Sequence, residues 1–258
     1  MKHIKKIVFI LTCVFSFLII FGGTLTAQAY SCTGTSTITC TFSFTGSLEN
    51  WTVPAGVNSI SVTAKGAGGG GGGSDNSGNQ TVGINGDLAT TTVSVTPLET
   101  LTIIVAGGGI KGVNDGSGSA GGAGYTNGGT GGNGEYYGYC GDSDADEWAY
   151  GGAGAGGSSG IKRNTTRLVE AKGGDGGKSS DYGGACAYNN GGSGGIGGGS
   201  NYPALTTQYG GGTGGAFDTD GGNGSLILTY TGAPSSSIFS FYAGSSGFRI
   251  FSPFRIFY

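Results

Sequence analysis

Glycine occupies 61 of the 258 positions, and its spacing constrains the fold more than any other feature of the chain. In at least four separate stretches it recurs every third residue, as at Gly151, Gly154, Gly157 and Gly160. This is the period of an extended left-handed helix that rises about 3.1 Å per residue and makes no internal hydrogen bonds. We therefore expect the glycine tracts to pack side by side as a polyglycine II-like bundle with a backbone core. The alternative is disorder, because ordering glycine costs the most entropy.

Between the tracts, short segments alternate apolar and polar residues with a period of two, which predicts half-buried strands. No stretch shows the pattern of an amphipathic helix, and only five prolines exclude collagen. The expected fold is all-β, an antiparallel β-sandwich with an inserted glycine-rich, polyglycine-II-like helix bundle and long loops. The expected strands cover residues 37–44, 57–64, 90–96, 101–106, 167–171 and 226–230.

The first 29 residues have the pattern of a secretory signal peptide. A basic start is followed by an apolar run from Ile7 to Phe21 and by Ala27-Gln-Ala29, after which we expect cleavage. A membrane-spanning anchor is the alternative, but the run is shorter than the roughly 20 residues that a span needs. The mature chain would be secreted or held at the cell surface.

Cleavage at this site would also change the charge and the available chemistry. It removes three of the twelve basic residues and leaves nine against fifteen acidic ones, a net charge near −6. Nucleic-acid binding, which needs clustered Lys and Arg, is therefore not expected. The only histidine, His3, is lost as well. We therefore expect no enzyme, since a serine nucleophile normally needs a histidine base.

Four cysteines would remain after cleavage, namely Cys32, Cys40, Cys140 and Cys186. An even number in an exported chain favours two disulfides over a zinc site, although three pairings are open. A Cys32–Cys40 bridge would staple the amino-terminal end. A Cys140–Cys186 bridge would join two aromatic insertions.

These insertions are the candidate binding site. Tyrosine and tryptophan on rigid loops are suited to binding a sugar or a protein. An alternative role for the aromatic side chains is to cap the bundle. The candidate binding residues are Tyr136, Tyr137, Tyr139, Trp148 and Tyr150 in the first insertion, and Tyr182 and Tyr188 in the second.

The first insertion also holds an acidic cluster, Asp142, Asp144 and Asp146, which resembles the start of a calcium loop. The pattern then fails, because Glu147 stands where glycine is needed and Ala153 where a bidentate glutamate belongs. Calcium is therefore only a weak expectation, and no other cofactor is expected.

Three stretches resemble the opening, middle and closing strands of bacterial and phage glycine-rich surface modules. They are Glu49-Asn-Trp-Thr-Val-Pro-Ala-Gly-Val57, Leu98-Glu-Thr-Leu-Thr-Ile-Ile-Val-Ala-Gly-Gly-Gly109 and Gly221-Gly-Asn-Gly-Ser-Leu-Ile-Leu-Thr-Tyr230. The glycine-rich region of the anaplastic lymphoma kinase receptor is similar in layout. The resemblance spans roughly Gly46 to Thr231 and implies a β-sandwich with a polyglycine helix bundle in its loops, used for surface recognition. The chain lacks the kinase and transmembrane parts of such a receptor.

The expected organisation is a signal peptide (1–29), an amino-terminal strand with its disulfide staple (30–48), a glycine-rich β-sandwich and polyglycine-II domain (49–232), and an aromatic tail (233–258). We expect the tail to be disordered or self-associating rather than packed on the sandwich. The favoured function is an adhesin-like binding protein that recognises an extracellular sugar or protein. A structural matrix or coat component and an ice-binding protein are the alternatives.

Overall fold

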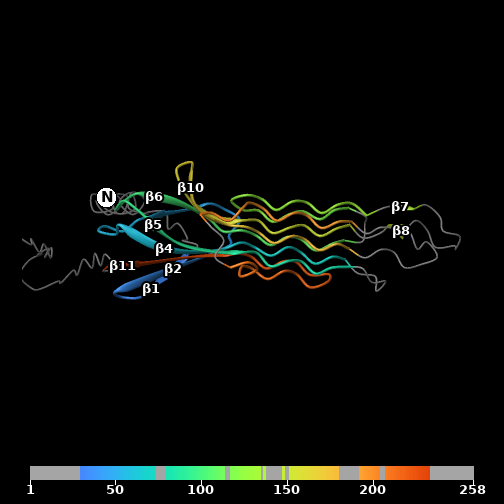
Figure 1. The fold of residues 1–258 in the computed structure, drawn as a ribbon, viewed down its shortest axis with the longest axis horizontal. Coiled ribbons are helices and arrows are strands. Elements are labelled where there is room, and N and C mark those ends of the chain that lie inside the picture. Colours follow the sequence, from blue (N-terminus) through green and yellow to red (C-terminus); the bar gives the residue numbers. More distant parts are fainter. Residues whose placement is uncertain are drawn as a thin grey trace, which may run out of the picture.

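The computed structural model describes residues 30–73, 80–113, 117–134, 136–137, 147–148, 151–179, 192–203 and 207–232. Within these residues every regular element is a β-strand, and every strand pair is antiparallel. Two sheets lie together at one end of an elongated molecule, and glycine-rich segments extend from them as a rod (Figure 1). The prediction of an all-β, antiparallel, sandwich-like fold is confirmed.

The larger sheet has five strands, and its sequences alternate as expected for strands with one buried face. In β2, Ile38, Cys40 and Phe42 are buried while Thr37 and Thr41 are exposed. The strands, in their order across the sheet, are β1 (Tyr30–Thr33), β2 (Thr37–Ser43), β11 (Ser225–Thr231), β4 (Ser59–Lys65) and β5 (Leu88–Ser94).

The smaller sheet has four strands. Gly160, which the three-residue glycine period assigned to a tract, lies here instead, opposite Ile104 on one side and Glu170 on the other. The local period fails at this point because strand pairing on both sides fixes the backbone. The order across the sheet is β10 (Thr166–Ala171), β9 (Ser159–Arg163), β6 (Thr100–Ile104) and β3 (Glu49–Thr52).

Large apolar side chains fill the space between the two sheets. Burying each one stabilises the fold by about 1.5–3 kcal/mol. Trp51 of β3 lies near Tyr230 of β11, with ring centroids 5.9 Å apart. The largest fully buried apolar side chains are Phe42, Ile60, Leu101, Ile103, Ile161, Leu226 and Leu228.

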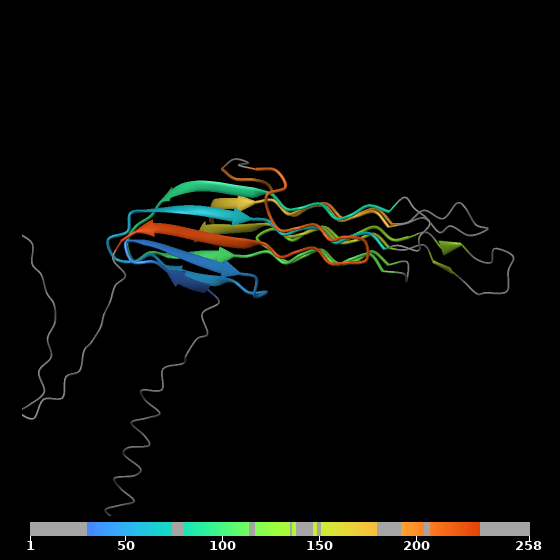
Figure 2. The same ribbon diagram turned by 90° about the horizontal axis from the view of Figure 1, so that it is seen from below.

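The rod is a direct continuation of the strands, as Figure 2 shows from a second direction. Its glycine-rich segments, which we call tracts, run along the same axis as the strands that they join. Tracts 66–73, 107–113 and 172–179 follow β4, β6 and β10. Tracts 80–87, 151–158 and 219–224 lead into β5, β9 and β11.

Tract 66–73 lies at one of two centres of the rod, and its amides point to three neighbours in turn. Gly66, Gly69 and Gly72 donate to tract 80–87, with N–O distances of 2.9 to 3.0 Å. The residue after each of the first two, Ala67 and Gly70, donates to tract 151–158. Gly68 and Gly71 donate to tract 219–224, and carbonyls of the tract accept from tracts 107–113, 172–179 and 210–216. Six neighbours therefore share the hydrogen bonds of one segment.

Tract 151–158 is the second centre and is also bonded to six neighbours. It donates to tracts 107–113, 126–134 and 172–179, and it accepts from 66–73, 117–124 and 192–199. We call 66–73 and 151–158 the central tracts. The peripheral tracts that surround them are 80–87, 107–113, 117–124, 126–134, 172–179, 192–199, 210–216 and 219–224.

The short distance between the backbones of neighbouring tracts explains why the central tracts carry so few side chains. A Cβ added to Gly69 would overlap the carbonyl oxygen of Asp175, and one added to Gly71 would overlap that of Ala216. By contrast, a Cβ on Gly232, outside the rod, would first meet Val57 Cγ2 at an ordinary 3.5 Å. Backbone fills the rod where side chains would fill an ordinary core.

Asn and Asp side chains on the outside of the rod accept hydrogen bonds from backbone amides, and we call them sealing side chains. Several peripheral amides that donate to no backbone carbonyl instead bond an Asn or Asp of the adjacent peripheral tract, which satisfies a group that would otherwise be unpaired. These pairs are Gly108 N with Asn223 Oδ1 (3.0 Å), Lys111 N with Asp220 Oδ1 (2.9 Å), Gly118 N with Asn133 Oδ1 (2.9 Å), Gly197 N with Asp175 Oδ1 (2.7 Å) and Gly214 N with Asn85 Oδ1 (2.6 Å).

Candidate functional site

Both aromatic insertions begin and end at the end of the rod that is farthest from the sandwich. The fully buried Ser179 connects the flanking segments there. Its hydroxyl accepts a hydrogen bond from Gly73 N at 2.9 Å and donates one to the carbonyl of Gly151 at 2.6 Å. Its amide donates to the carbonyl of Gly192 at 3.1 Å. Residues 151, 179 and 192, which flank the two insertions, are therefore held together.

Part of the first insertion is visible as a short antiparallel ladder. Strand β7 (Tyr136–Tyr137) pairs with β8 (Glu147–Trp148), so that Tyr136 lies opposite Trp148 and Tyr137 opposite Glu147. Figures 1 and 2 both show this ladder beyond the far end of the tracts. The structure thus places three of the predicted binding residues together at the distal tip.

The remaining predicted site residues lie outside the described residues, and their roles stay predictions. The Cys32–Cys40 bridge is present, with an S–S distance of 1.97 Å between directly opposed residues of β1 and β2. The predicted residues that the structure does not describe are Tyr139, Tyr150, Tyr182, Tyr188, Asp142, Asp144, Asp146, Cys140 and Cys186.

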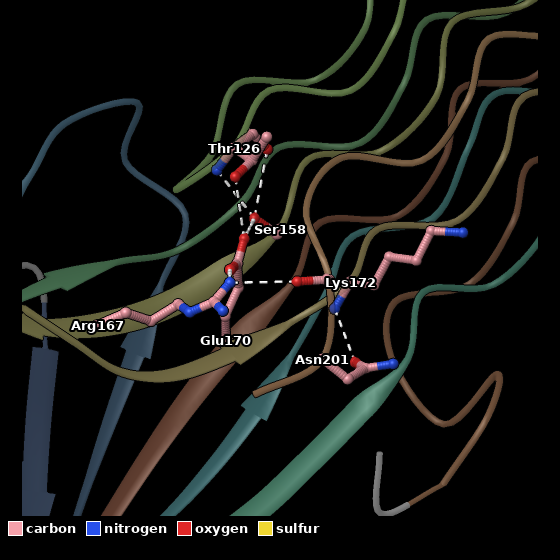
Figure 3. Close-up of polar contacts among 7 residues, drawn as sticks. Thr126, Ser158, Arg167, Glu170, Lys172 and Asn201 are labelled. Atoms are coloured by element: carbon pink, nitrogen blue, oxygen red, sulfur yellow. Dashed lines mark hydrogen bonds and ion pairs between the residues drawn. The ribbon is translucent and has the colours of Figure 1, made fainter. Parts of the chain in front are cut away.

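A polar cluster at the junction of rod and sandwich was not predicted from the sequence. Its centre is Glu170 of β10, whose side chain is only 1% exposed (Figure 3). Glu170 Oε1 accepts hydrogen bonds from Ser158 Oγ at 2.6 Å and from Thr126 Oγ1 at 3.0 Å. Glu170 Oε2 accepts from Arg167 Nη1 at 2.6 Å. Both carboxylate oxygens of this buried charge are therefore satisfied, as burial of a charge requires.

The same cluster fixes the chain after tract 192–199. The backbones of Tyr202 and Glu170 exchange two hydrogen bonds, and the guanidinium of Arg167 lies 4.5 Å from the centre of the Tyr202 ring. Gly199 has φ = +74°, and a Cβ there would overlap Glu170 Oε1. Only glycine lets the chain turn so close to the carboxylate.

Further along, Asn201 extends the polar cluster. It accepts from Lys172 N at 3.0 Å and donates to Asp87 Oδ2 at 2.8 Å. Burial raises the pKa of the neighbouring Tyr125 above its ordinary value, and the Glu170 charge raises it further. The Ser158 hydroxyl donates to Glu170 while its oxygen accepts from Thr126 N at 2.9 Å, so it is committed to holding the junction.

A second ion pair lies at the end of the sandwich away from the rod. Arg163 binds Glu99 through two hydrogen bonds, Nε to Oε2 at 2.7 Å and Nη2 to Oε1 at 2.8 Å. The hydrogen bond from Arg163 lowers the pKa of Glu99, against a smaller opposing effect of burial. The pair joins β9 to the turn before β6, and we assign it a structural role.

Sequence periodicity could not find the Glu170 cluster, because its members come from positions 126, 158, 167 and 170. The sequence Val169-Glu170-Ala171 alternates like a half-buried strand, which would place Glu170 on the solvent side, whereas all three residues are buried. The burial of Glu170, and with it the need for a partner, is seen only in the structure.

A β-sandwich that continues into a hydrogen-bonded glycine rod defines this chain as a glycine-rich β-protein. The model of a family described as a glycine-rich domain matches residues 42–247 of the 258, and the chain belongs to that family. No curated protein matches the sequence. The described part of the chain holds no helix of the length and apolarity needed to cross a membrane.

Proposed function

We propose that this chain is a secreted or cell-surface, non-enzymatic binding protein, adhesin-like in its use of a rigid rod to present a Tyr/Trp-rich tip. The observation that carries the proposal is the position of the β7–β8 ladder. It pairs Tyr136 with Trp148 at the end of the rod farthest from the sandwich. Aromatic rings on a rigid support contribute contact area at low entropic cost. The partner in this proposal is an extracellular sugar or protein.

The proposal includes a finer description of the rod, as a bundle of polyglycine II-type helices. Two features support it. Every third amide of tract 66–73 donates to the same neighbour, as in the sequence Gly66, Gly69, Gly72, and each central tract has six neighbours. The three-residue period and the absence of bonds within a tract are those of a left-handed helix of this type.

A stiff rod suits a binding tip because the tip needs a fixed position. The two insertions that carry the aromatic residues begin and end at Gly134, Gly151, Ser179 and Gly192, which belong to hydrogen-bonded tracts. A site supported in this way loses less conformational entropy on binding than one on a flexible linker. The proposed Cys140–Cys186 bridge would add to this rigidity.

The structural alternative, a matrix or coat in which rods pack side by side, has less support. On several peripheral tracts every third residue is exposed and carries a side chain. Examples are Ser117, Ala120 and Ala123 on one tract, and Asn127, Thr130 and Asn133 on another. Together with the sealing Asn and Asp residues, these side chains occupy the space that the backbone of a neighbouring rod would need.

To test the proposal, the full chain is exported through an oxidising route and screened on glycan and cell-surface protein arrays. The test variant is Trp148→Ala/Tyr139→Ala. The matched control is Tyr209→Ala/Phe217→Ala, which removes two aromatic side chains that are 51% and 43% exposed elsewhere. Specific capture that only the test variant loses supports a recognition tip. Folded protein that captures nothing, or capture that both variants retain, contradicts it.

A further inference from the structure

One side of the sandwich is covered and the other is open. The edge strands β5 and β10 lie on the same side, and both are bridged by the chain that follows tract 192–199. Tyr202 pairs with Glu170 of β10, and Thr207 pairs with Leu88 of β5. On the opposite side, the edges of β1 and β3 pair with no further strand in the described part of the chain. Unpaired edges of this kind are templates for another strand.

The open side is also incompletely packed. The larger sheet has five strands and the smaller one four, so the smaller sheet ends at β3 without covering β1. Cys32 and Tyr30 of β1 lie directly opposite Cys40 and Phe42, which are fully buried, and therefore face the same side of the sheet. Cys32 is nevertheless exposed and Tyr30 only partly buried. A fifth strand beside β3 would cover both.

The last described residue lies beside this open side. Gly232 N donates to the carbonyl of Ser36, in the turn between β1 and β2, at 3.2 Å. A Cβ on Gly232 would lie 3.5 Å from Val57 Cγ2, in the loop that follows β3. The ring of Tyr230, two residues earlier, is 5.9 Å from that of Trp51 in β3. The chain therefore leaves the sandwich between the two open edges.

The sequence that follows has the pattern that this edge requires. Residues 233–237 read Ala-Pro-Ser-Ser-Ser, and Ile238-Phe-Ser-Phe-Tyr242 then places Phe239 and Phe241 on one face of an extended segment. Five connecting residues reach about 16 Å, more than the ~10 Å between stacked sheets. The family match also continues past β11 to residue 247.

In place of the sequence-based expectation that the tail does not pack on the sandwich, we propose that residues 238–242 add to β3 as a fifth strand of the smaller sheet. Because β3 runs from the rod toward the far end of the sandwich and the chain returns from Gly232, the added strand is antiparallel to β3. Phe239 and Phe241 then pack over Tyr30 and the Cys32–Cys40 disulfide. The sandwich becomes five strands on five, with the carboxyl-terminal segment closing the open side.

The test is amide hydrogen exchange on the full chain, read in peptides covering β3 (Glu49–Thr52) and β1 (Tyr30–Thr33). The variant Phe239→Ser/Phe241→Ser removes the two rings of the proposed strand. Its matched control, Phe254→Ser/Phe257→Ser, removes two rings from the tail outside it. We expect exchange in β3 to be at least tenfold faster in the variant than in the wild type and the control.

Three results would overturn the proposal. The first is equal exchange in β3 for all three proteins. The second is protection that moves to β1 instead, which would place the segment on the other edge. The third is protection that rises with protein concentration, as measured alongside the oligomeric state by light scattering, because the strand would then come from a second copy.

Discussion

The sandwich and the rod bury their backbones by opposite means. In the sandwich, hydrogen bonds run within two sheets, and side chains such as Phe42 and Leu228 fill the space between them. In the rod, hydrogen bonds leave each central tract in six directions, and the glycine positions leave no space for a Cβ. The stability of the first depends on side-chain volume, whereas that of the second depends on the absence of side chains. Opposite substitutions should therefore destabilise the two regions: adding a side chain should destabilise the rod, and removing one should destabilise the sandwich.

The largest effect is expected from adding one methyl group to a central tract. In Gly69→Ala the new Cβ would overlap the carbonyl of Asp175, whose position is fixed by hydrogen bonds from Gly174 N to tract 66–73 and from Gly176 N to tract 192–199. We expect a loss of at least about 5 kcal/mol, beyond the usual range for a point substitution, measured by denaturant unfolding. The control is Gly232→Ala, whose new Cβ would lie at an ordinary van der Waals distance of 3.5 Å from Val57 Cγ2. This variant should unfold like the wild type. Similar stability of the two variants would contradict a backbone core.

Removing side-chain volume from the sandwich should come next. Phe42→Ala empties a fully buried site and is expected to cost about 3–5 kcal/mol. Calorimetric unfolding would measure the loss, with Phe217→Ala, at a 43% exposed site, as the matched control. If hydrogen exchange in tracts 66–73 and 151–158 stays slow while the sheets open, the two regions are separate cooperative units. Simultaneous opening would show that they unfold as one.

A smaller loss is expected when a sealing side chain is removed. Asn223→Ala leaves Gly108 N without its 3.0 Å acceptor, at the surface where water can partly replace it. The expected cost is about 0.5–1.5 kcal/mol by thermal unfolding. Asn223→Asp, which keeps the acceptor, should restore most of it. An Asn223→Ala variant as stable as the wild type would mean that the sealing side chains do not contribute to the stability of the rod.

The smallest effect concerns the ion pair of the sandwich and depends on pH. Because Arg163 lowers the pKa of Glu99, the pair stabilises the fold above the pKa of the unfolded carboxyl. This contribution is lost as the pH falls through the lower folded pKa. Glu99→Gln should cost less than about 1 kcal/mol near neutrality, since Arg163 is 36% exposed. The gap from the wild type should close in acid, and a gap that is constant with pH would contradict this origin.

Predictability from sequence also differs between the two regions. Period-two alternation located most of the sandwich, including β2, β4 and β11. It missed β1 and β3, which have four residues each, and β9, whose Ser159-Gly160 start reads as a continuation of the tract before it. Short edges and tract-to-strand transitions carry too few residues for a period to show. Their pairing is set by partners far away in the sequence.

For the rod, the glycine period indicated which segments could lie side by side but not which were central. The two central tracts contain no side chain larger than serine, which is a usable signal. It is incomplete because tract 117–124 meets it too and lies at the periphery. From the sequence, the two aromatic insertions were expected to lie together only because a Cys140–Cys186 bridge was assumed. The buried contacts of Ser179 are what bring their bases together.

The six-neighbour position of tract 66–73 has a consequence for the order in which the chain can assemble. Its partners are spread from residue 81 to residue 222, and the last of them directly precede β11. A chain that emerges from its amino end has therefore completed about nine tenths of its length before this segment can satisfy all its amides. Until then tract 66–73 lacks two of its six neighbours, tracts 210–216 and 219–224, whereas all the partners of tract 151–158 lie before residue 199. The half of the rod around tract 66–73 therefore closes last, when the final strand arrives.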